Sequence, residues 1–232
     1  MKLLGGANMT VILKRDFFKD SIINIATLIE QQRNHLTELD SDIGDGDHGI
    51  NMSIGFREVS KKIEEFDDVA EDISSLLKKI GMTLLGKVGG ASGPLYGSFF
   101  MKMGESIKGK NEVTFNEFID MIEDGVLAIE NRGKAILGDK TMVDALRPGV
   151  DYLRSSNIDN NELEIFSEFV SVMKQGSDNT IPLVAKKGRA LRLGERAVGY
   201  RDPGSESSWM IMNVFYEEMM NHTKINSNKV QV

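Results

Sequence analysis

The 232-residue sequence contains no cysteine, only four prolines and a single tryptophan. The absence of cysteine excludes disulfides, thiolate metal ligands and a cysteine nucleophile. Long hydrophobic runs are also absent, since the apolar residues 11–13 are followed at once by Lys14, Arg15 and Asp16. We therefore expect no signal peptide, no membrane span and a cytoplasmic location. The net charge of −7 argues against nucleic acid or an anionic membrane as a partner.

One short segment is unusually rich in aspartate and glycine. Residues 40–49 (DSDIGDGDHG) place four carboxylates within eight residues, interleaved with glycines. Like charges this close repel one another, so we expect a cation among them. Mg²⁺ is held by a few carboxylates, with water or phosphate oxygens in its other positions, and the glycines allow Asp40, Asp45 and Asp47 to converge. The spacing does not fit an EF-hand, and a solvated acidic turn is the simpler alternative.

Elsewhere the sequence is typical of amphipathic helices joined by glycine-rich loops. In the first helix, expected over about residues 16–35, apolar side chains recur every three or four residues at Phe18, Ile22, Ile25 and Ile29. No segment shows convincing alternation with period two, so we expect no strand. The pattern predicts an all-α domain of about eight helices, arranged as an antiparallel bundle or closed barrel.

The same pattern suggests where the domain begins and ends. We expect the helical domain over residues 14–222, preceded by a leader of residues 1–13 in which Met9 could be the true start. Residues 223–232 are expected to form a polar tail that frays. Residues 161–187 are compatible with one bent helix or with two.

Three further loops are rich in glycine or in basic residues. Residues 86–94 could present backbone N–H groups to an anion, although a tight helix connection is the simpler reading; residues 133–140 form a second such loop. Residues 186–204 collect six basic side chains in an otherwise acidic chain, which suggests an anionic partner, although such residues also serve solubility. In an up-and-down bundle alternate connections lie at one end, so these loops would meet the acidic segment there. Metal-binding carboxylates, glycine-rich loops and arginines at one end of a helical bundle are typical of a site for a nucleotide polyphosphate.

Several of these motifs occur together in a known family. From about Phe17 to Met220 the sequence resembles the nucleotide-binding L subunit of dihydroxyacetone kinase, and the order of the motifs makes chance similarity a poor explanation. A single glycine motif would be weak evidence. The motifs are residues 40–49, 81–85 (GMTLL), 89–94 (GGASGP), 138–142 (GDKTM), 187–190 (KGRA) and 193–196 (LGER).

The resemblance implies an eight-helix barrel with ADP or ATP at one end and two Mg²⁺ ions between carboxylates and phosphates. Asp40, Asp45 and Asp47 match the family's metal ligands, and Asp42 stands where the family allows glutamate and is not itself a ligand. The positions that match the family's nucleotide contacts are His48, Gly49, Ile50, Asn51, Ala91, Ser92, Gly133, Met142, Arg189, Asp202, Pro203 and Gly204.

Three of these residues have more specific expected roles. Met142 could simply fill the core at helical spacing, but the resemblance favours packing on the adenine. Arg189 is the catalytic candidate, because phosphoryl transfer requires neutralisation of charge on the moving group. His48 is expected to contact the nucleotide or brace the metal loop rather than to carry phosphate.

The resemblance leaves the source of the phosphate open. In the phosphotransferase-system type, L holds ADP, a phosphohistidine-carrying M protein donates phosphate, and dihydroxyacetone is bound on a separate K subunit. We expect that role here, with K and M as partners and no nucleic acid or membrane. Two alternatives are a kinase subunit exchanging free ATP for another short ketose such as erythrulose, and a regulatory module that binds a transcription regulator in a nucleotide-dependent way.

Overall fold

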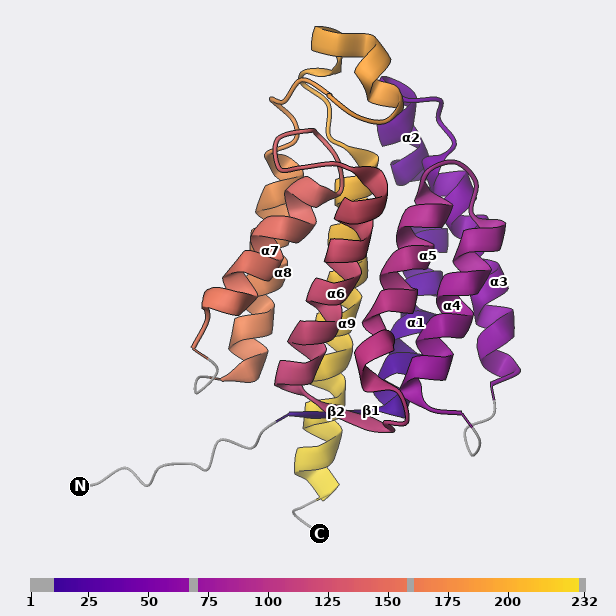
Figure 1. Cartoon of the computed structure of the whole chain (residues 1–232), viewed down its shortest axis with the longest axis vertical. Coiled ribbons are helices and arrows are strands. Elements are labelled where there is room, and N and C mark those ends of the chain that lie inside the picture. Colours follow the sequence, from indigo (N-terminus) through magenta and orange to yellow (C-terminus); the bar gives the residue numbers. More distant parts are fainter. Residues whose placement is uncertain (1–10, 67–70, 158–160, 230–232) are drawn as a thin grey trace, which may run out of the picture.

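The computed structural model describes residues 11–66, 71–157 and 161–229. Within them, eight long helices form a closed ring in which each helix packs on the next and the last packs on the first (Figure 1). This arrangement confirms the predicted all-α barrel. In ring order the helices are α1 (Arg15–Gln31), α3 (His48–Glu64), α4 (Ile73–Lys87), α5 (Ser92–Met103), α6 (Phe115–Gly133), α7 (Val143–Ser155), α8 (Glu162–Asp178) and α9 (Pro203–Lys229).

A small sheet corrects the expectation that the chain has no strand. β1 (Ile12–Lys14) pairs antiparallel with β2 (Glu112–Thr114), and Leu13 lies opposite Val113 with both side chains buried. Three residues are too short to show a periodicity, which is why the sequence pattern did not reveal them. The expected leader thus ends in a strand, while residues 1–10, including Met9, lie outside the described residues.

The acidic segment is more helical than predicted. After Gln32 the chain forms a separate helix, α2 (Arg33–Ile43), so that Asp40 lies in its last turn. Leu36, Asp40 and Ile43 are buried along one face of α2, because spacings of four and three place them together. Only residues 44–47 form the loop before α3.

The C-terminal half also differs in detail. α8 is a single helix ending at Asp178, and an irregular segment follows that includes the short 3₁₀ helix η2 (Arg189–Ala197). Another 3₁₀ helix, η1 (Glu105–Ile107), lies between α5 and β2. α9 continues to Lys229, so the helix does not end where the polar tail was expected to begin. No helix in the described part of the chain combines the length and apolar character needed to cross a membrane.

Aromatic packing closes the end of the barrel near the sheet. Phe118 of α6 lies at the centre of a group of buried rings. Its ring centroid is 5.7 Å from Phe17 of α1, 5.6 Å from Phe166 of α8 and 5.6 Å from Phe215 of α9. Such edge-to-face and tilted pairs each contribute about 0.5–1.5 kcal/mol beyond simple burial. The rings join helices that are distant in sequence and leave only the other end of the barrel open.

α4 and α5 approach each other through glycine. A Cβ atom added at Gly81 would lie 2.6 Å from the carbonyl oxygen of Gly97, and one at Gly97 would lie 2.8 Å from that of Gly81. Backbones can come this close only where both side chains are absent. This contact lets α4 and α5 pack closely on either side of the loop of residues 88–91.

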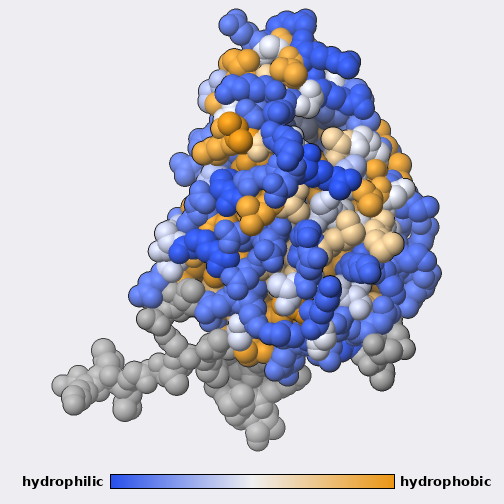
Figure 2. Space-filling view, in the orientation of Figure 1, coloured by the Kyte–Doolittle hydropathy of each residue, from blue (hydrophilic) through white to orange (hydrophobic). Residues whose placement is uncertain are grey.

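The alternate connections meet at the open end, as predicted. Residues 44–47, 88–91, 134–142 and 179–202 all lie at the upper end in Figure 1, opposite the sheet and the C-terminus. The surface of the face in Figure 2 is mainly hydrophilic, with scattered hydrophobic patches. The open end is thus built from these connections and from the helix ends that they join.

Candidate functional site

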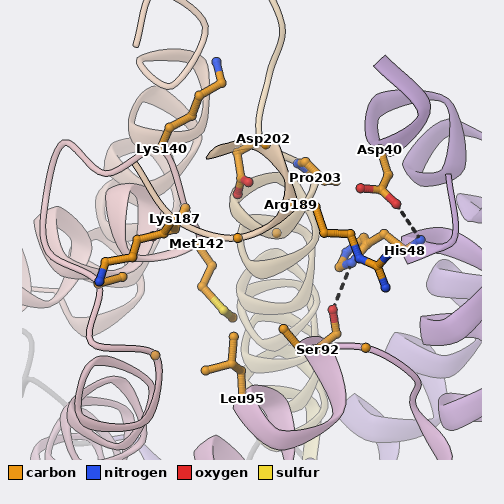
Figure 3. Close-up of a pocket in the computed structure, with 18 of the residues that line it drawn as sticks. Asp40, His48, Ser92, Leu95, Lys140, Met142, Lys187, Arg189, Asp202 and Pro203 are labelled. Atoms are coloured by element: carbon orange, nitrogen blue, oxygen red, sulfur yellow. Dashed lines mark hydrogen bonds between the residues drawn. The ribbon is translucent and has the colours of Figure 1, made fainter. Parts of the chain in front are cut away.

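A pocket of about 250 Å³ opens between the four upper connections. One wall is apolar and comes from α5, α6 and the start of α7. Leu95 and Met142 face each other in this part of the pocket (Figure 3), and Ile129 and Val143 also line it. Gly133 leaves room here, since an added Cβ would lie 3.4 Å from Leu95. The wall can accept a flat apolar group such as a nucleobase.

The opposite wall is charged. Asp40, Asp45 and Asp47 each offer a carboxylate oxygen within 4.8 Å of the others. Asp40 is buried at the end of α2, and its Oδ2 accepts hydrogen bonds from the backbone N–H groups of Asp47 (2.8 Å) and His48 (3.1 Å). This side chain therefore holds the first turn of α3 against α2 and fixes the loop that carries the other two carboxylates.

Arg189 lies beside this cluster. Its guanidinium forms an ion pair with Asp45, and a second nitrogen is 3.8 Å from Asp47. A cationic side chain thus already sits at the carboxylates, as their charge requires. Three carboxylate ligands, Asp40 from the last turn of α2 and the partly exposed Asp45 and Asp47 from the loop that follows, fit a hard divalent cation such as Mg²⁺.

His48 joins three elements at the floor of the pocket. Its side chain is buried, with Nδ1 3.1 Å from the Ser92 hydroxyl and Nε2 2.9 Å from the Ser207 hydroxyl. Burial lowers the pKa of His48 to about 4, although Asp40 and Asp47 act in the opposite direction. The imidazole is therefore neutral at pH 7, and both ring nitrogens are engaged. This geometry supports the bracing role and leaves neither nitrogen free to accept phosphate.

Asp202 stands just before α9 and points into the pocket (Figure 3). Its carboxylate accepts a hydrogen bond of 2.6 Å from the backbone N–H of Ser205, which caps the helix. Burial raises the pKa of Asp202 to about 7; the bond to Ser205 opposes this shift, the nearby Asp144 adds to it, and Lys140 opposes it. The group can therefore change charge near neutral pH.

Lys140 is an important residue that the sequence analysis did not select. The residue is 1% exposed. The ammonium donates hydrogen bonds to the carbonyl oxygens of Thr180 (2.6 Å), Ile181 (3.4 Å) and Tyr200. Burial lowers its pKa, while Asp202 and Asp144 act in the opposite direction. Lys140 thus links the loop of residues 134–142 to both ends of the segment that carries Arg189. In the sequence, the one signal of its importance was its position inside the GDKTM motif.

Three predicted nucleotide contacts do not line the pocket. Gly49 packs on α2, because an added Cβ would lie 2.0 Å from the carbonyl oxygen of Arg33, and Ile50 is next to it in the first turn of α3. Asn51 supports the neighbouring loop: a Cβ at Gly89 would lie 2.7 Å from its Oδ1. The other predicted residues do line the pocket: Asp40, Asp45, Asp47, His48, Ala91, Ser92, Gly133, Met142, Arg189, Asp202, Pro203 and Gly204.

The chain is thus a helical nucleotide-site barrel by its architecture: a closed ring of helices whose open end combines an acidic cluster with an apolar slot. Residues 42–217 match the DAK2 domain, and the chain belongs to the DAK2 domain family. It is 59% identical over 209 residues to the ADP-binding subunit DhaL of PEP-dependent dihydroxyacetone kinase 2 from Listeria innocua, which covers 90% of this chain and 97% of that protein. The resemblance found in the sequence is thereby confirmed.

Two further comparisons agree. The chain is 41% identical over 188 residues to the corresponding DhaL subunit of Escherichia coli K12, covering 81% of this chain and 89% of that one. Its fold matches the crystal structure of the dihydroxyacetone kinase from C. freundii in complex with AMP-PNP and Mg²⁺, with a TM-score of 0.67 and 22% identity. That match covers 94% of this chain and 36% of the longer kinase chain, and it shows the fold.

Proposed function

We propose that this chain is the ADP-binding subunit of a PEP-dependent dihydroxyacetone kinase. In this role ADP accepts a phosphoryl group from a phosphohistidine on an M protein and becomes ATP, and the γ-phosphoryl group then passes to a hydroxyl of dihydroxyacetone held on a K subunit, which regenerates ADP. The observation that carries the proposal is the 59% identity to Listeria DhaL over almost the whole of both chains. The pocket supports it, because it joins an apolar slot to a cluster of carboxylates.

The walls of the pocket suggest how the nucleotide lies. The adenine packs between Leu95 and Met142, where the wall is apolar and Gly133 leaves space. The phosphates extend toward the charged wall, near Ser92 and the backbone of the loop before it. That loop precedes α5, whose N-terminus favours negative charge.

The carboxylate cluster provides the place for metal. Asp40, Asp45 and Asp47 would hold Mg²⁺, and we propose two ions, the number that the resemblance to the dihydroxyacetone kinase family implies. Bound Mg²⁺ supplies neutralisation of charge on the phosphates. Arg189 lies beside the same carboxylates and is placed to stabilise charge on the phosphoryl group as it moves.

The mouth of the pocket is also suited to partner proteins, since donor and acceptor must both reach the terminal phosphate. The upper connections expose several large apolar side chains, which a soluble partner would cover. We propose that the K subunit and the M protein bind there in turn, and that a transcription regulator could use the same surface. The exposed residues are Ile136, Leu137, Val184, Leu191, Val198 and Tyr200.

The first experiment is to purify the chain without added nucleotide, denature it and identify any released small molecule by mass spectrometry, with metal measured on the same sample. Near-stoichiometric ADP with Mg²⁺ is the expected result. A site that is empty as purified but binds Mg-ATP reversibly would favour the alternative of an ATP-exchanging subunit, for erythrulose or another short ketose. Failure to bind any nucleotide would contradict the proposal.

The role of Arg189 has a matched control in the same 3₁₀ helix. Arg189→Ala should keep bound ADP but reduce phosphoryl transfer to dihydroxyacetone by about a hundredfold or more, as expected when a group that stabilises transition-state charge is removed. Arg192→Ala removes an exposed arginine three residues away and should transfer at nearly the normal rate. The assay is transfer with purified K and M proteins. Equal activity of the two variants would remove Arg189 from the mechanism.

A further inference from the structure

A chain of hydrogen bonds runs from the pocket into the core of the barrel. It begins at Ser92, which lines the pocket and whose hydroxyl oxygen is 3.1 Å from His48 Nδ1 (Figure 3). On the other side of the imidazole, Nε2 is 2.9 Å from the hydroxyl oxygen of Ser207. The hydroxyl of Tyr96 lies 2.7 Å from that same Ser207 oxygen. His48, Ser207 and Tyr96 are all buried, so this chain is shielded from solvent along most of its length.

The protons in this chain are coupled, because each hydroxyl and the neutral imidazole has only one to donate. In one arrangement, which we call outward, Tyr96 donates to Ser207, Ser207 donates to His48 Nε2, and the Nδ1–H of His48 donates to Ser92. In the reverse arrangement Nε2–H donates to Ser207, and Ser92 donates its proton to Nδ1. The Ser207 proton then goes to the carbonyl oxygen of Pro203, 3.0 Å away. The two arrangements differ in the tautomer of His48.

The two arrangements also differ in what Ser92 presents to the pocket. In the outward arrangement the Ser92 oxygen accepts from His48, and its own proton is free to be donated to a group in the pocket. In the reverse arrangement that proton is used, and only oxygen lone pairs face the pocket. Phosphate oxygens are acceptors, so only the outward arrangement gives a hydrogen bond between Ser92 and a phosphate.

We infer that Tyr96, Ser207 and His48 are positioning residues that direct the Ser92 hydroxyl proton toward a phosphate oxygen of the bound nucleotide. The inference rests on the proposed function, in which the phosphates lie near Ser92. Tyr96 suits the start of the chain, because a phenol is more acidic than a serine hydroxyl and donates more strongly. Burial raises the pKa of Tyr96 to about 12, so its proton is retained at neutral pH. Hydrogen bonds aligned in one direction polarise and strengthen one another.

The first test is the tautomer of His48. The chain has only three histidines, so ¹⁵N NMR of the labelled protein can resolve the ring of His48, which is identified by its loss in His48→Gln. With Mg-ADP bound, Nδ1 should carry the proton and Nε2 should have the chemical shift of an acceptor nitrogen. A proton on Nε2 in the ADP-bound protein would overturn the inference, because Ser92 would then have no proton for the phosphate.

The second test is the coupling between Ser92 and Ser207 in the affinity for Mg-ADP, measured by calorimetric titration of the chain freed of nucleotide. Ser92→Ala should weaken binding about tenfold, and Ser207→Ala about fivefold. The double variant should bind no more weakly than Ser92→Ala alone, because Ser207 acts on the nucleotide only through Ser92. If the two effects are simply additive, Ser207 acts by packing and the inference is wrong.

Ser208→Ala is the matched control for Ser207→Ala. Ser208 is the next residue of α9, is also buried and lies 3.0 Å from the Tyr96 oxygen, but its proton goes to the carbonyl oxygen of Gly204, 2.8 Å away. Its loss should leave the affinity for Mg-ADP within about twofold of the wild type. A loss of affinity equal to that of Ser207→Ala would contradict the chain. Urea unfolding checks that every variant is folded.

Tyr96→Phe removes only the phenolic oxygen at the start of the chain. Without that donor, the Ser207 oxygen can accept from Nε2–H, so the Nε2–H form of His48 should become more populated and Mg-ADP should bind about threefold more weakly. An unchanged tautomer and affinity would contradict the inference and leave the proposed function intact. A wild-type chain that binds no Mg-ADP would overturn both.

Discussion

At the scale of single residues, the charge state of His48 depends on its burial. In the folded protein the pKa of His48 is about 4, compared with 6.5 for an unburied histidine. Between these values the unfolded chain binds a proton that the folded chain does not, so the stability that His48 contributes is complete above pH 6.5 and is lost as the pH falls toward 4. The pocket thus keeps this imidazole neutral, and the resulting loss of folding stability appears only at acidic pH.

This leads to a prediction for His48→Gln, which keeps hydrogen-bonding capacity but cannot titrate. When the pH falls from 7.5 to 5, the free energy of unfolding of the wild type should decrease by about 2 kcal/mol relative to that of His48→Gln. The measurement is urea unfolding of both proteins at the two pH values. A difference that does not change with pH would mean that His48 is not held neutral.

The comparison must be made between the two proteins and not on the wild type alone. The pKa of Asp202 is raised from 3.8 to about 7, so the folded chain retains a proton that the unfolded chain has lost. The stability contributed by Asp202 therefore falls as the pH rises through this window, opposite to the effect of His48. The two pocket residues thus have opposing effects, which offset each other in the stability of the wild type.

At the scale of elements, the α4 to α5 contact depends on missing side chains. Gly81→Ala places a methyl group 2.6 Å from the carbonyl oxygen of Gly97 in the facing helix, and we expect a loss of about 1–3 kcal/mol. Gly86→Ala is the matched control on the same helix, because its Cβ would meet nothing within 4 Å, and alanine there should stabilise the helix by about 0.5–1 kcal/mol. Urea unfolding measures both. Equal changes in the free energy of unfolding for the two variants would mean that helix propensity, and not the contact between α4 and α5, determines the stability at Gly81.

The two largest upper connections depend on Lys140. Lys140→Met keeps the bulk of the side chain but removes the ammonium that donates to the carbonyl oxygens of Thr180, Ile181 and Tyr200, at a cost of about 1–3 kcal/mol. Amide hydrogen exchange should accelerate across residues 179–202, which include Arg189. The control Lys186→Met replaces an exposed lysine of the same segment and should leave exchange nearly unchanged. If exchange is unaltered in Lys140→Met, other contacts hold this segment.

At the scale of the whole molecule, ligand at the open end should stabilise the entire barrel, because the pocket draws on every upper connection. Under the proposed function, Mg-ADP at a hundred times its dissociation constant adds about 2.7 kcal/mol, or about 5–10 °C in melting temperature for a chain of this size. Chelation of the metal should reverse much of this gain, and Asp45→Asn should reduce it. His222→Gln should respond to Mg-ADP as the wild type does. Calorimetry with and without chelator measures these shifts.

The sequence by itself determined the features that depend on neighbouring residues. Apolar spacing in segments such as Phe18 to Ile29 was sufficient to predict the helices, because periodicity is local. The density of aspartates between Asp40 and Asp47 was sufficient to predict a cation site, because repulsion between close charges needs no knowledge of the fold. The meeting of alternate loops at one end followed from the up-and-down order of the helices.

Only the tertiary structure decided contacts between distant residues. Leu13 pairs with Val113, Lys140 binds the carbonyl oxygens of a later loop, and Asp20 meets His222 across the closed ring. The direction in which a side chain points within the first turn of α3 also came from packing, which places Asn51 behind Gly89 and not among the residues that line the pocket. The physical reason is that such contacts form only when the helices close into a ring, and no local pattern in the chain encodes which residues then face each other.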